Sequence, residues 1–333
     1  MLNIDALMTA RITRRAVIGG AGAVAAATGL AFAQPVSAPR VKGPRVFLDY
    51  DQAELDDAYD QSVYAPNLRQ ITARFATNSE ATRARIGAPR RYAYGPTEIE
   101  KLDIYPTKRA NAPIHIFIHG GAWRGGLAKD YAFPAEMFVN AGAHYVVPDF
   151  VWVQNAPDSL RTMADQVRRA VAWVYKNAAS IGGDPSRLYV SGHSSGGHLA
   201  SVVLVTDWQK DFGLPVDTVK AGLCGSGMYD LRGPRLSARS SYVKFDDAME
   251  QALSAQRHLD KLNAPLIVAC GTLETPEFQR QNRDFAEAVK KAGKPVQLLV
   301  GEGYNHFEIM ETLANPYGLL GRAALAQMRL SVA

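Results

Sequence analysis

Short apolar runs alternate along the chain with longer segments in which apolar residues recur every three or four positions. The runs are "PIHIFIHG", "AHYVVPDF", "SRLYVSG", "VKAGLCGSG", "APLIVACG" and "PVQLLVGEG". Because their apolar residues are nearly continuous, these runs predict strands that are buried on both faces. The clearest helix is predicted over 158–180, where Asp158 is placed as the N-cap and one face carries Leu160, Met163, Val167, Val171 and Val174.

Strands that alternate with helices predict an α/β fold, a mostly parallel twisted sheet with helices on both faces. Ahead of this alternation, "RYAYG" and "KLDIYP" predict a two-stranded hairpin. Residues 46–86 are mainly helical in pattern, polar and rich in tyrosine, and we expect a small N-terminal helical cap at about 45–90. Ligands of such sheets bind beyond the carboxyl ends of the strands, so reactive residues should directly follow the apolar runs.

The first 33 residues have a pattern of their own. A twin arginine in "TRRAV" precedes a mildly apolar run rich in Gly and Ala, and "AFA" supplies the small residues that signal peptidases accept. The pattern predicts a twin-arginine-type signal peptide at 1–33 and a single domain at 34–333 that is exported to the bacterial periplasm. An uncleaved anchor or a mis-assigned start is the alternative. The run is too short and too weakly apolar to leave a stable membrane span.

The composition is that of a globular protein, with 47% hydrophobic and 21% charged residues. Three arginines against one aspartate give 1–33 a net charge of +2, which leaves +3 of the chain's +5 to the remainder. The Lys and Arg of that remainder are dispersed, so we expect no nucleic-acid partner. Cys224 and Cys270 each lie in a predicted buried strand and are expected to be free thiols rather than nucleophiles. The oligomeric state stays open between a monomer and a homodimer.

Residues 192–196 read G-H-S-S-G and fit the pattern G-x-S-x-G between a predicted strand and a predicted helix. A turn this tight requires small flanking residues and holds the central hydroxyl above the sheet. Ser194 is therefore the candidate nucleophile. Its neighbour Ser195 fails the pattern, because His193 rather than a glycine lies two residues before it.

A serine hydroxyl is a poor nucleophile unless a base takes its proton. In chains with this motif the order is serine, acid, histidine, which leaves His198, His258 and His306 as bases. His198 lies in the same predicted helix as Ser194, and His258 lies on the wrong side of the following strand. His306 follows the last strand, in a loop that can reach over the sheet, and is the candidate base.

The acid should follow the strand "APLIVACG", where "TLETPEF" offers Glu274 and Glu277. Glu274 is nearer the strand end and is the candidate, with Asp230 as the fallback. Its role would be to fix the tautomer of His306 and to stabilise the imidazolium as it forms.

The stretch "IFIHGGAWRGG" follows another strand and predicts an oxyanion hole at Gly120, Gly121 and Ala122, completed by the amide of Ser195. Two histidines of this strand have no third ligand nearby, so we expect no metal. Aromatic residues near the predicted strand ends are candidates for substrate contact or for core packing: Trp123, Phe150, Trp152, Tyr304 and Phe307.

With these residues in place, the chain resembles the α/β-hydrolase superfamily, specifically the hormone-sensitive-lipase-like esterases and their arylformamidase (kynurenine formamidase) relatives. The resemblance covers most of 60–315 and rests on "YAPN", "HGGAW", "DQVRRAV", "SGHSSGGHLA", "TDW" and "NHFEIMETL". The stretch "ETPEFQRQ" is similar to the one that carries the catalytic acid in that group, usually an aspartate. The matching position here is Glu274.

The resemblance implies hydrolysis through an acyl-enzyme without a cofactor. Ser194 would attack a carbonyl, His306 would relay the proton, and the amides of Gly121, Ala122 and Ser195 would hold the oxyanion. Two features differ from the arylformamidases of tryptophan catabolism: the predicted export, and Ala122 where several relatives have a larger residue.

Both features favour a serine carboxylesterase for small, aromatic esters, with an arylformamidase or amidase for N-formylkynurenine-like amides as the alternative. The expected partner is a small-molecule ester or amide. A non-catalytic binding protein is disfavoured because every member of the triad has a candidate. A long-chain lipase is disfavoured because no long apolar lid segment is present.

Overall fold

The structure is a computed structural model that describes residues 40–331. The predicted signal peptide at 1–33 lies outside these residues. One compact unit begins at Gly43 and contains every helix and strand discussed below. Within the described range, no helix combines the length and the apolar character that a membrane span requires.

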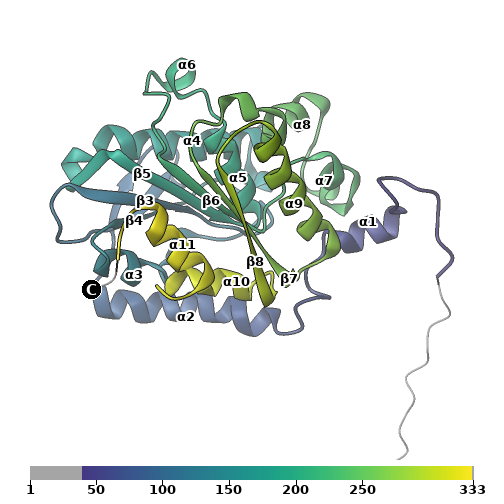
Figure 1. Ribbon diagram of the computed structural model, residues 1–333, viewed down its shortest axis with the longest axis horizontal. Coiled ribbons are helices and arrows are strands. Elements are labelled where there is room, and N and C mark those ends of the chain that lie inside the picture. Colours follow the sequence, from purple (N-terminus) through teal and green to yellow (C-terminus); the bar gives the residue numbers. More distant parts are fainter. Residues whose placement is uncertain (1–39, 332–333) are drawn as a thin grey trace, which may run out of the picture. The chain divides into compact units, whose positions relative to one another are not determined.

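Eight strands form one sheet in the order β1-β2-β4-β3-β5-β6-β7-β8 (Figure 1). The strands are β1 (Arg90–Ala93), β2 (Lys101–Tyr105), β3 (Ala112–Ile118), β4 (His144–Pro148), β5 (Gly183–His193), β6 (Ala221–Gly225), β7 (Leu266–Leu273) and β8 (Val296–Asn305). β1 and β2 form the predicted hairpin, and β2 is also antiparallel to β4. All the other neighbouring pairs are parallel, which confirms the mostly parallel sheet.

The α-helices of the described residues are α1 (Gln52–Ala58), α2 (Leu68–Ile86), α3 (Ala135–Asn140), α4 (Ser159–Asn177), α5 (Ser195–Leu204), α6 (Trp208–Phe212), α7 (Arg232–Leu236), α8 (Asp247–Leu253), α9 (Pro276–Lys291), α10 (Glu308–Glu311) and α11 (Leu319–Gln327). They belong to two apolar cores. Helices α4, α5, α8 and α9 contribute to one core, and α2, α3, α10 and α11 contribute to the other.

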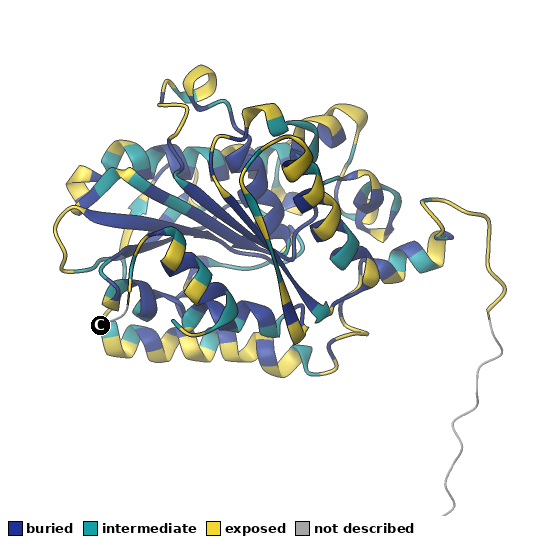
Figure 2. Cartoon of the chain, in the orientation of Figure 1, coloured by how far each residue is buried: buried dark blue, intermediate teal, exposed yellow. Residues whose placement is uncertain are grey.

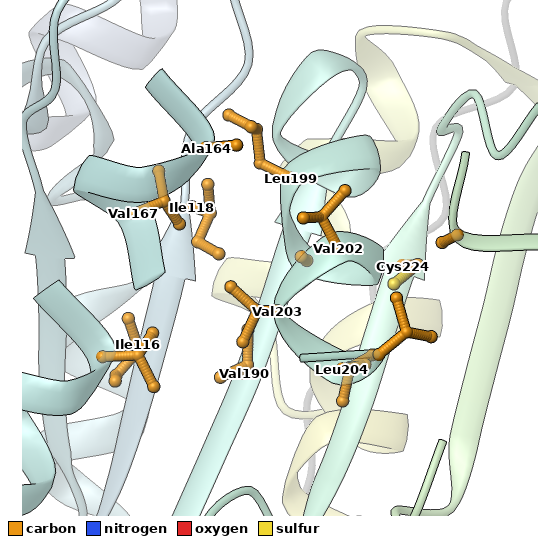
Figure 3. Packing of buried hydrophobic residues seen from close by; sticks show 14 of the residues in the cluster. Ile116, Ile118, Ala164, Val167, Val190, Leu199, Val202, Val203, Leu204 and Cys224 are labelled. Carbon is orange, nitrogen blue, oxygen red and sulfur yellow. The ribbon is translucent and has the colours of Figure 1, made fainter. Parts of the chain in front are cut away.

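The central strands contribute to both cores, as their nearly continuous apolar runs predict. Along β3, Ile114, Ile116 and Ile118 belong to the first core, while Phe117 belongs to the second. Figure 2 shows these strands as buried, whereas the helices keep an exposed outer face. Figure 3 shows Ile116 and Ile118 in the first core together with side chains of α4 and α5. Both faces of the sheet are therefore covered, and its carboxyl edge carries the polar residues described next.

Two elements differ in detail from the sequence prediction. Helix α4 ends at Asn177, and its N-cap Asp158 makes no capping bond to the backbone. The Asp158 carboxylate instead accepts a hydrogen bond from Arg161 Nη1 at 3.0 Å. Strand β8 is only partly buried, and Val300 is 51% exposed. The reason is its place at the edge of the sheet, where no further strand covers it.

Candidate active site

Ser194 stands between β5 and α5 in a backbone conformation that side-chain-bearing residues rarely adopt, with φ 59° and ψ −128°. The turn has room only for small neighbours. A Cβ on Gly192 would lie 2.1 Å from the carbonyl oxygen of Gly196, and a Cβ on Gly196 would lie 2.1 Å from that of Ile118. The Ser194 amide donates to the carbonyl of Gly225 in β6 at 2.9 Å. Packing and this bond hold the strained serine at the carboxyl edge of the sheet.

Ser194, His306 and Glu274 form one continuous chain of hydrogen bonds. The Ser194 hydroxyl lies 2.8 Å from His306 Nε2, and His306 Nδ1 lies 2.8 Å from Glu274 Oε2. The second carboxylate oxygen, Oε1, accepts bonds from the Ser226 hydroxyl and the Gly271 amide, each at 2.6 Å. Glu274 is fully buried, so these donors fix its position without solvent. The structure thus brings the three sequence-predicted residues together.

The other candidate acids have different partners. Glu277 accepts a hydrogen bond from the Tyr59 hydroxyl at 2.8 Å and pairs with Arg280 at 2.6 Å. Asp230 pairs with Arg257 at 2.8 Å. Neither carboxylate is bonded to His306, which selects Glu274 on geometry.

The other candidate bases are also engaged away from Ser194. His198 accepts a hydrogen bond from Trp123 Nε1 at 3.2 Å, and its Nε2 lies 2.9 Å from the carbonyl of Leu253. His258 Nε2 lies 2.7 Å from the carbonyl of Gln251. Of the three histidines that follow Ser194, His306 is the one in contact with its hydroxyl.

The glycine loop after β3 packs directly against the serine turn. A Cβ on Gly120 would lie 2.8 Å from the carbonyl oxygen of His193 and 3.1 Å from the Cβ of Ser194. Gly121 and Ala122 both have positive φ, at 119° and 54°. These values bend the loop backbone sharply beside the serine turn, and an oxyanion hole requires backbone amides close to the attacking hydroxyl.

Among the described residues, the amides of Gly121, Ala122 and Ser195 have no hydrogen-bond partner, and the amide of Gly120 has none either. The Ser195 amide is the first of helix α5, so it has no acceptor within the helix. The amides predicted for the oxyanion hole are therefore available to an oxygen of a bound molecule.

A cleft of about 620 Å³ opens at Ser194 and His306. Its walls come from five segments of the chain: 56–75, 120–131, 193–194, 237–242 and 306–307. The first of these segments lies within the stretch of about 45–90 for which the sequence predicts a small cap, and its residues Tyr59 and Phe75 line the cleft. This volume lies within the range of small-molecule sites.

The structure sorts the five aromatic candidates. Only Phe307 is among the residues that line the cleft. Trp123 and Phe150 are buried in the first core, where the Phe150 ring stacks on His119. The Trp152 indole donates to the carbonyl of Gly126 at 3.0 Å, and Tyr304 is 36% exposed on β8. Residues of the 237–242 segment line the cleft instead, and no motif in the sequence marks them.

Buried histidines around the site are held neutral. Burial and the neighbouring His306 ring, 4.8 Å away, hold the pKa of His193 well below its usual range. Burial lowers the pKa of His198 to about 4. His115, 2.7 Å from the Ser191 hydroxyl, has its pKa lowered by burial to about 3. Among the described residues, no group of three or more His, Cys, Asp or Glu is placed to hold a metal ion.

Both cysteines are free and buried, as predicted. They lie on the adjacent strands β6 and β7. Burial raises the pKa of Cys270 to about 12, and it raises the pKa of Cys224 further. Thiols that stay protonated are poor nucleophiles, so neither cysteine is suited to nucleophilic chemistry.

Known proteins are similar to this chain over much of its length. A model of the BD-FAE family matches residues 102–225, which include the glycine loop and the serine turn. Kynurenine formamidase from Salmo salar is 33% identical over 235 residues, which cover 67% of this chain and 76% of that protein. Kynurenine formamidase from Danio rerio is 29% identical over 285 residues, 82% of this chain and 94% of that protein.

The fold also recurs in solved structures. An esterase from Pyrobaculum calidifontis superposes with a TM-score of 0.61 at 19% sequence identity, over 82% of this chain and 97% of that chain.

Proposed function

Because this chain has the α/β-hydrolase fold and belongs to the arylformamidase-like group of hydrolases, we propose that it cleaves small carboxylic esters, aromatic ones among them, through a serine acyl-enzyme. The observation that carries this proposal is the chain of hydrogen bonds from Ser194 through His306 to Glu274 on the wall of the cleft. A nucleophile, a base and an orienting carboxylate in this geometry are the parts that acyl transfer needs.

The first half of the reaction forms the acyl-enzyme. Ser194 Oγ attacks the ester carbonyl while His306 Nε2 takes the hydroxyl proton. The negative charge that develops on the carbonyl oxygen is met by the amides of Gly121, Ala122 and Ser195. Glu274 holds the Nδ1–H tautomer and stabilises the imidazolium. Collapse of the tetrahedral intermediate breaks the ester bond, and His306 returns its proton to the leaving alcohol.

The second half releases the acid. A water molecule loses a proton to His306 Nε2 and attacks the acyl carbonyl, and the oxyanion again lies against the same amides. Collapse breaks the bond to Ser194 Oγ, which regains a proton from His306. The carboxylic acid product then leaves, and neither half of the proposed reaction uses a cofactor.

A second candidate is amide hydrolysis of the arylformamidase type. It is favoured by the identity to the kynurenine formamidase from Salmo salar, 33% over 235 residues. The same residues would serve, with His306 protonating the leaving nitrogen rather than an alkoxide. Ala122 supports ester hydrolysis instead, because this small residue of the glycine loop leaves more room for the acyl group of the substrate than a larger residue would.

The test compares kcat/KM for N-formylkynurenine with kcat/KM for 4-nitrophenyl esters from acetate to octanoate, with Ser194→Ala as the blank. Short esters hydrolysed far faster than formylkynurenine would support the esterase. A preference for formylkynurenine by orders of magnitude would replace it with the arylformamidase. Hydrolysis of both that survives in Ser194→Ala would overturn the serine mechanism altogether.

We also propose export to the bacterial periplasm, supported by the twin-arginine pattern in 1–33. Fusing this segment to a reporter that folds in the cytoplasm tests the route. Export that is lost when both Arg14 and Arg15 are changed to lysine supports it, and export that is unaffected contradicts it.

A further inference from the structure

Arg239 is a buried cation on the wall of the cleft. It belongs to the short 3-10 helix Ala238–Ser241 and lines the same cavity as Ser194 and His306. Only 9% of its surface is exposed. Arginines are rarely this buried unless a carboxylate or phosphate accompanies them.

The partners of this guanidinium are all neutral. Nη1 donates to the Tyr242 hydroxyl at 2.8 Å, and Nη2 donates to the backbone carbonyl of Tyr59 at 3.0 Å. Nε has no hydrogen-bond partner. Since a guanidinium carries five N–H donors, three of them remain unused.

No carboxylate compensates the charge directly. Asp56, Asp57 and Asp60 line the same cleft, yet no ion pair joins Arg239 to a carboxylate in the part of the chain that the structure describes. Asp56 instead accepts hydrogen bonds from the Ala238 amide at 2.6 Å and from Gln52 at 2.9 Å. A buried charge without a partner is costly, which makes this arrangement unfavourable in the empty protein.

Aromatic rings fix the guanidinium in place. Its central carbon lies 5.4 Å from the centre of the Trp123 ring and 5.7 Å from that of Tyr59. Such contacts hold a guanidinium plane without using its N–H donors. The side chain is thus positioned before any ligand binds, and a planar fork with free donors matches the two oxygens of a carboxylate.

We propose that Arg239 binds a carboxylate of the substrate, so that the protein acts on small esters or amides that carry a second, ionised carboxyl group. This inference rests on the proposed function, because it places the carboxylate in the cleft where Ser194 attacks. It makes Arg239 a specificity-determining residue. The bound carboxylate then supplies acceptors for the unused N–H donors of Arg239 and the counter-charge that the guanidinium lacks.

Pairs of esters that differ only in charge test the proposal. In one pair the charge is on the leaving group: 4-acetoxybenzoate and its methyl ester. In the other it is on the acyl group: monophenyl succinate and its methyl ester. We expect the wild-type protein to prefer the charged member of at least one pair by about 10-fold or more in kcat/KM.

Substitutions then assign that preference. Arg239→Met should lower kcat/KM for the charged ester by about 30-fold while changing the neutral one by less than about 3-fold. Arg239→Lys, which keeps the charge but loses the planar fork, should restore part of the preference. Arg322→Met removes an exposed arginine of α11 outside the cleft and should leave both rates unchanged.

A wild-type protein that hydrolyses the neutral member of both pairs equally well or better overturns the proposal, and this needs no variant. A preference that survives in Arg239→Met overturns it as well. Both members of a pair depend equally on Ser194, so a failure of the proposed function appears as loss of both rates. A failure of the present inference appears as loss of the charge preference alone.

Discussion

The hydroxyl of Ser195 accepts a hydrogen bond from the backbone amide of Trp123 at 3.2 Å. This bond joins the turn that carries Ser194 to the glycine loop that follows β3. In the proposed mechanism Ser194 and the Ser195 amide follow β5, while the amides of Gly121 and Ala122 follow β3. Their spacing has to be held to a fraction of an ångström for the donors to meet the oxyanion. A single buried side chain thus couples the two halves of the site.

Adding a methyl group to Gly120 should disturb that spacing. Its Cβ would lie 2.8 Å from the carbonyl oxygen of His193, so the loop has to move away from Ser194. We expect Gly120→Ala to lower kcat by about 100-fold, the effect of losing one oxyanion donor. Gly125→Ala is the matched control in the same loop, because its nearest neighbour would be at 3.7 Å. Equal activity of the two variants, measured with 4-nitrophenyl acetate, would contradict the prediction.

Removing the nucleophile should abolish turnover. We expect Ser194→Ala to lower kcat by at least about 10⁴-fold, because no other described hydroxyl bonds to His306. Ser201→Ala is the control: its hydroxyl, seven positions on, bonds to the carbonyl of His198 inside helix α5. A fluorophosphonate probe should label the wild type and Ser201→Ala and leave Ser194→Ala unlabelled. Labelling of all three would place the nucleophile elsewhere.

The two glutamates of the "ETPEF" stretch should give opposite signatures. Glu274→Gln keeps the shape of the site but loses the charge that orients His306, so we expect kcat to fall by about 10³-fold or more. Glu277→Gln leaves Arg280 without its buried partner and should cost about 2 kcal/mol in the free energy of unfolding, with little change in kcat. Urea unfolding and ester hydrolysis on both variants separate the roles. A reversed pattern would move the catalytic acid to Glu277.

Acid should destabilise the fold partly through His115. Its folded pKa is lowered to about 3 from an unfolded value near 6.5. Below pH 6.5 the unfolded chain therefore binds a proton that the folded chain does not, which costs about 1.4 kcal/mol per pH unit down to about pH 3. Above pH 7 neither state is protonated, and the group has no effect.

His115→Gln removes the acid-dependent loss of unfolding free energy that His115 causes. Between pH 6.5 and pH 5 the variant should lose about 2 kcal/mol less of its unfolding free energy than the wild type does. Between pH 7 and pH 8 the two should change in parallel. Urea titrations across this range check it, and parallel curves at every pH would show that His115 does not resist protonation.

The cysteines should be inert in the folded protein. Burial raises the pKa of Cys270 to about 12 and raises that of Cys224 above its usual value, so neither presents a thiolate at neutral pH. We expect Ellman's reagent to titrate none of the chain's two cysteines in buffer and both in guanidinium chloride. Rapid reaction of either thiol in buffer would mean that its strand opens.

The sheet, the hairpin and the position of the serine turn could all be predicted from the residues of each segment. Apolar periodicity and Gly–x–Ser–x–Gly are local properties, since a turn of a few residues between β5 and α5 depends on those residues and little else. The reactive residues could also be predicted from their order along the chain. This order selected His306 from the histidines after Ser194 and placed the acid near the end of β7, although 112 positions separate Ser194 from His306.

Which side chains meet in the cleft depends on how distant segments of the chain pack against one another. The choice of Glu274 over Asp230 depends on the distance to His306, and that distance is set by how β7 and β8 pack. The aromatic candidates divided in the same way, because Trp123 and Phe150 turn into the core while Phe307 faces the cavity.

Arg239 could not be found from the sequence at all. Its surroundings are Tyr59, Trp123 and Tyr242, and two of these come from segments more than a hundred residues away along the chain. A side chain's burial and its missing counter-charge are properties of that assembly of distant segments. They have no local pattern, and folding is what creates them.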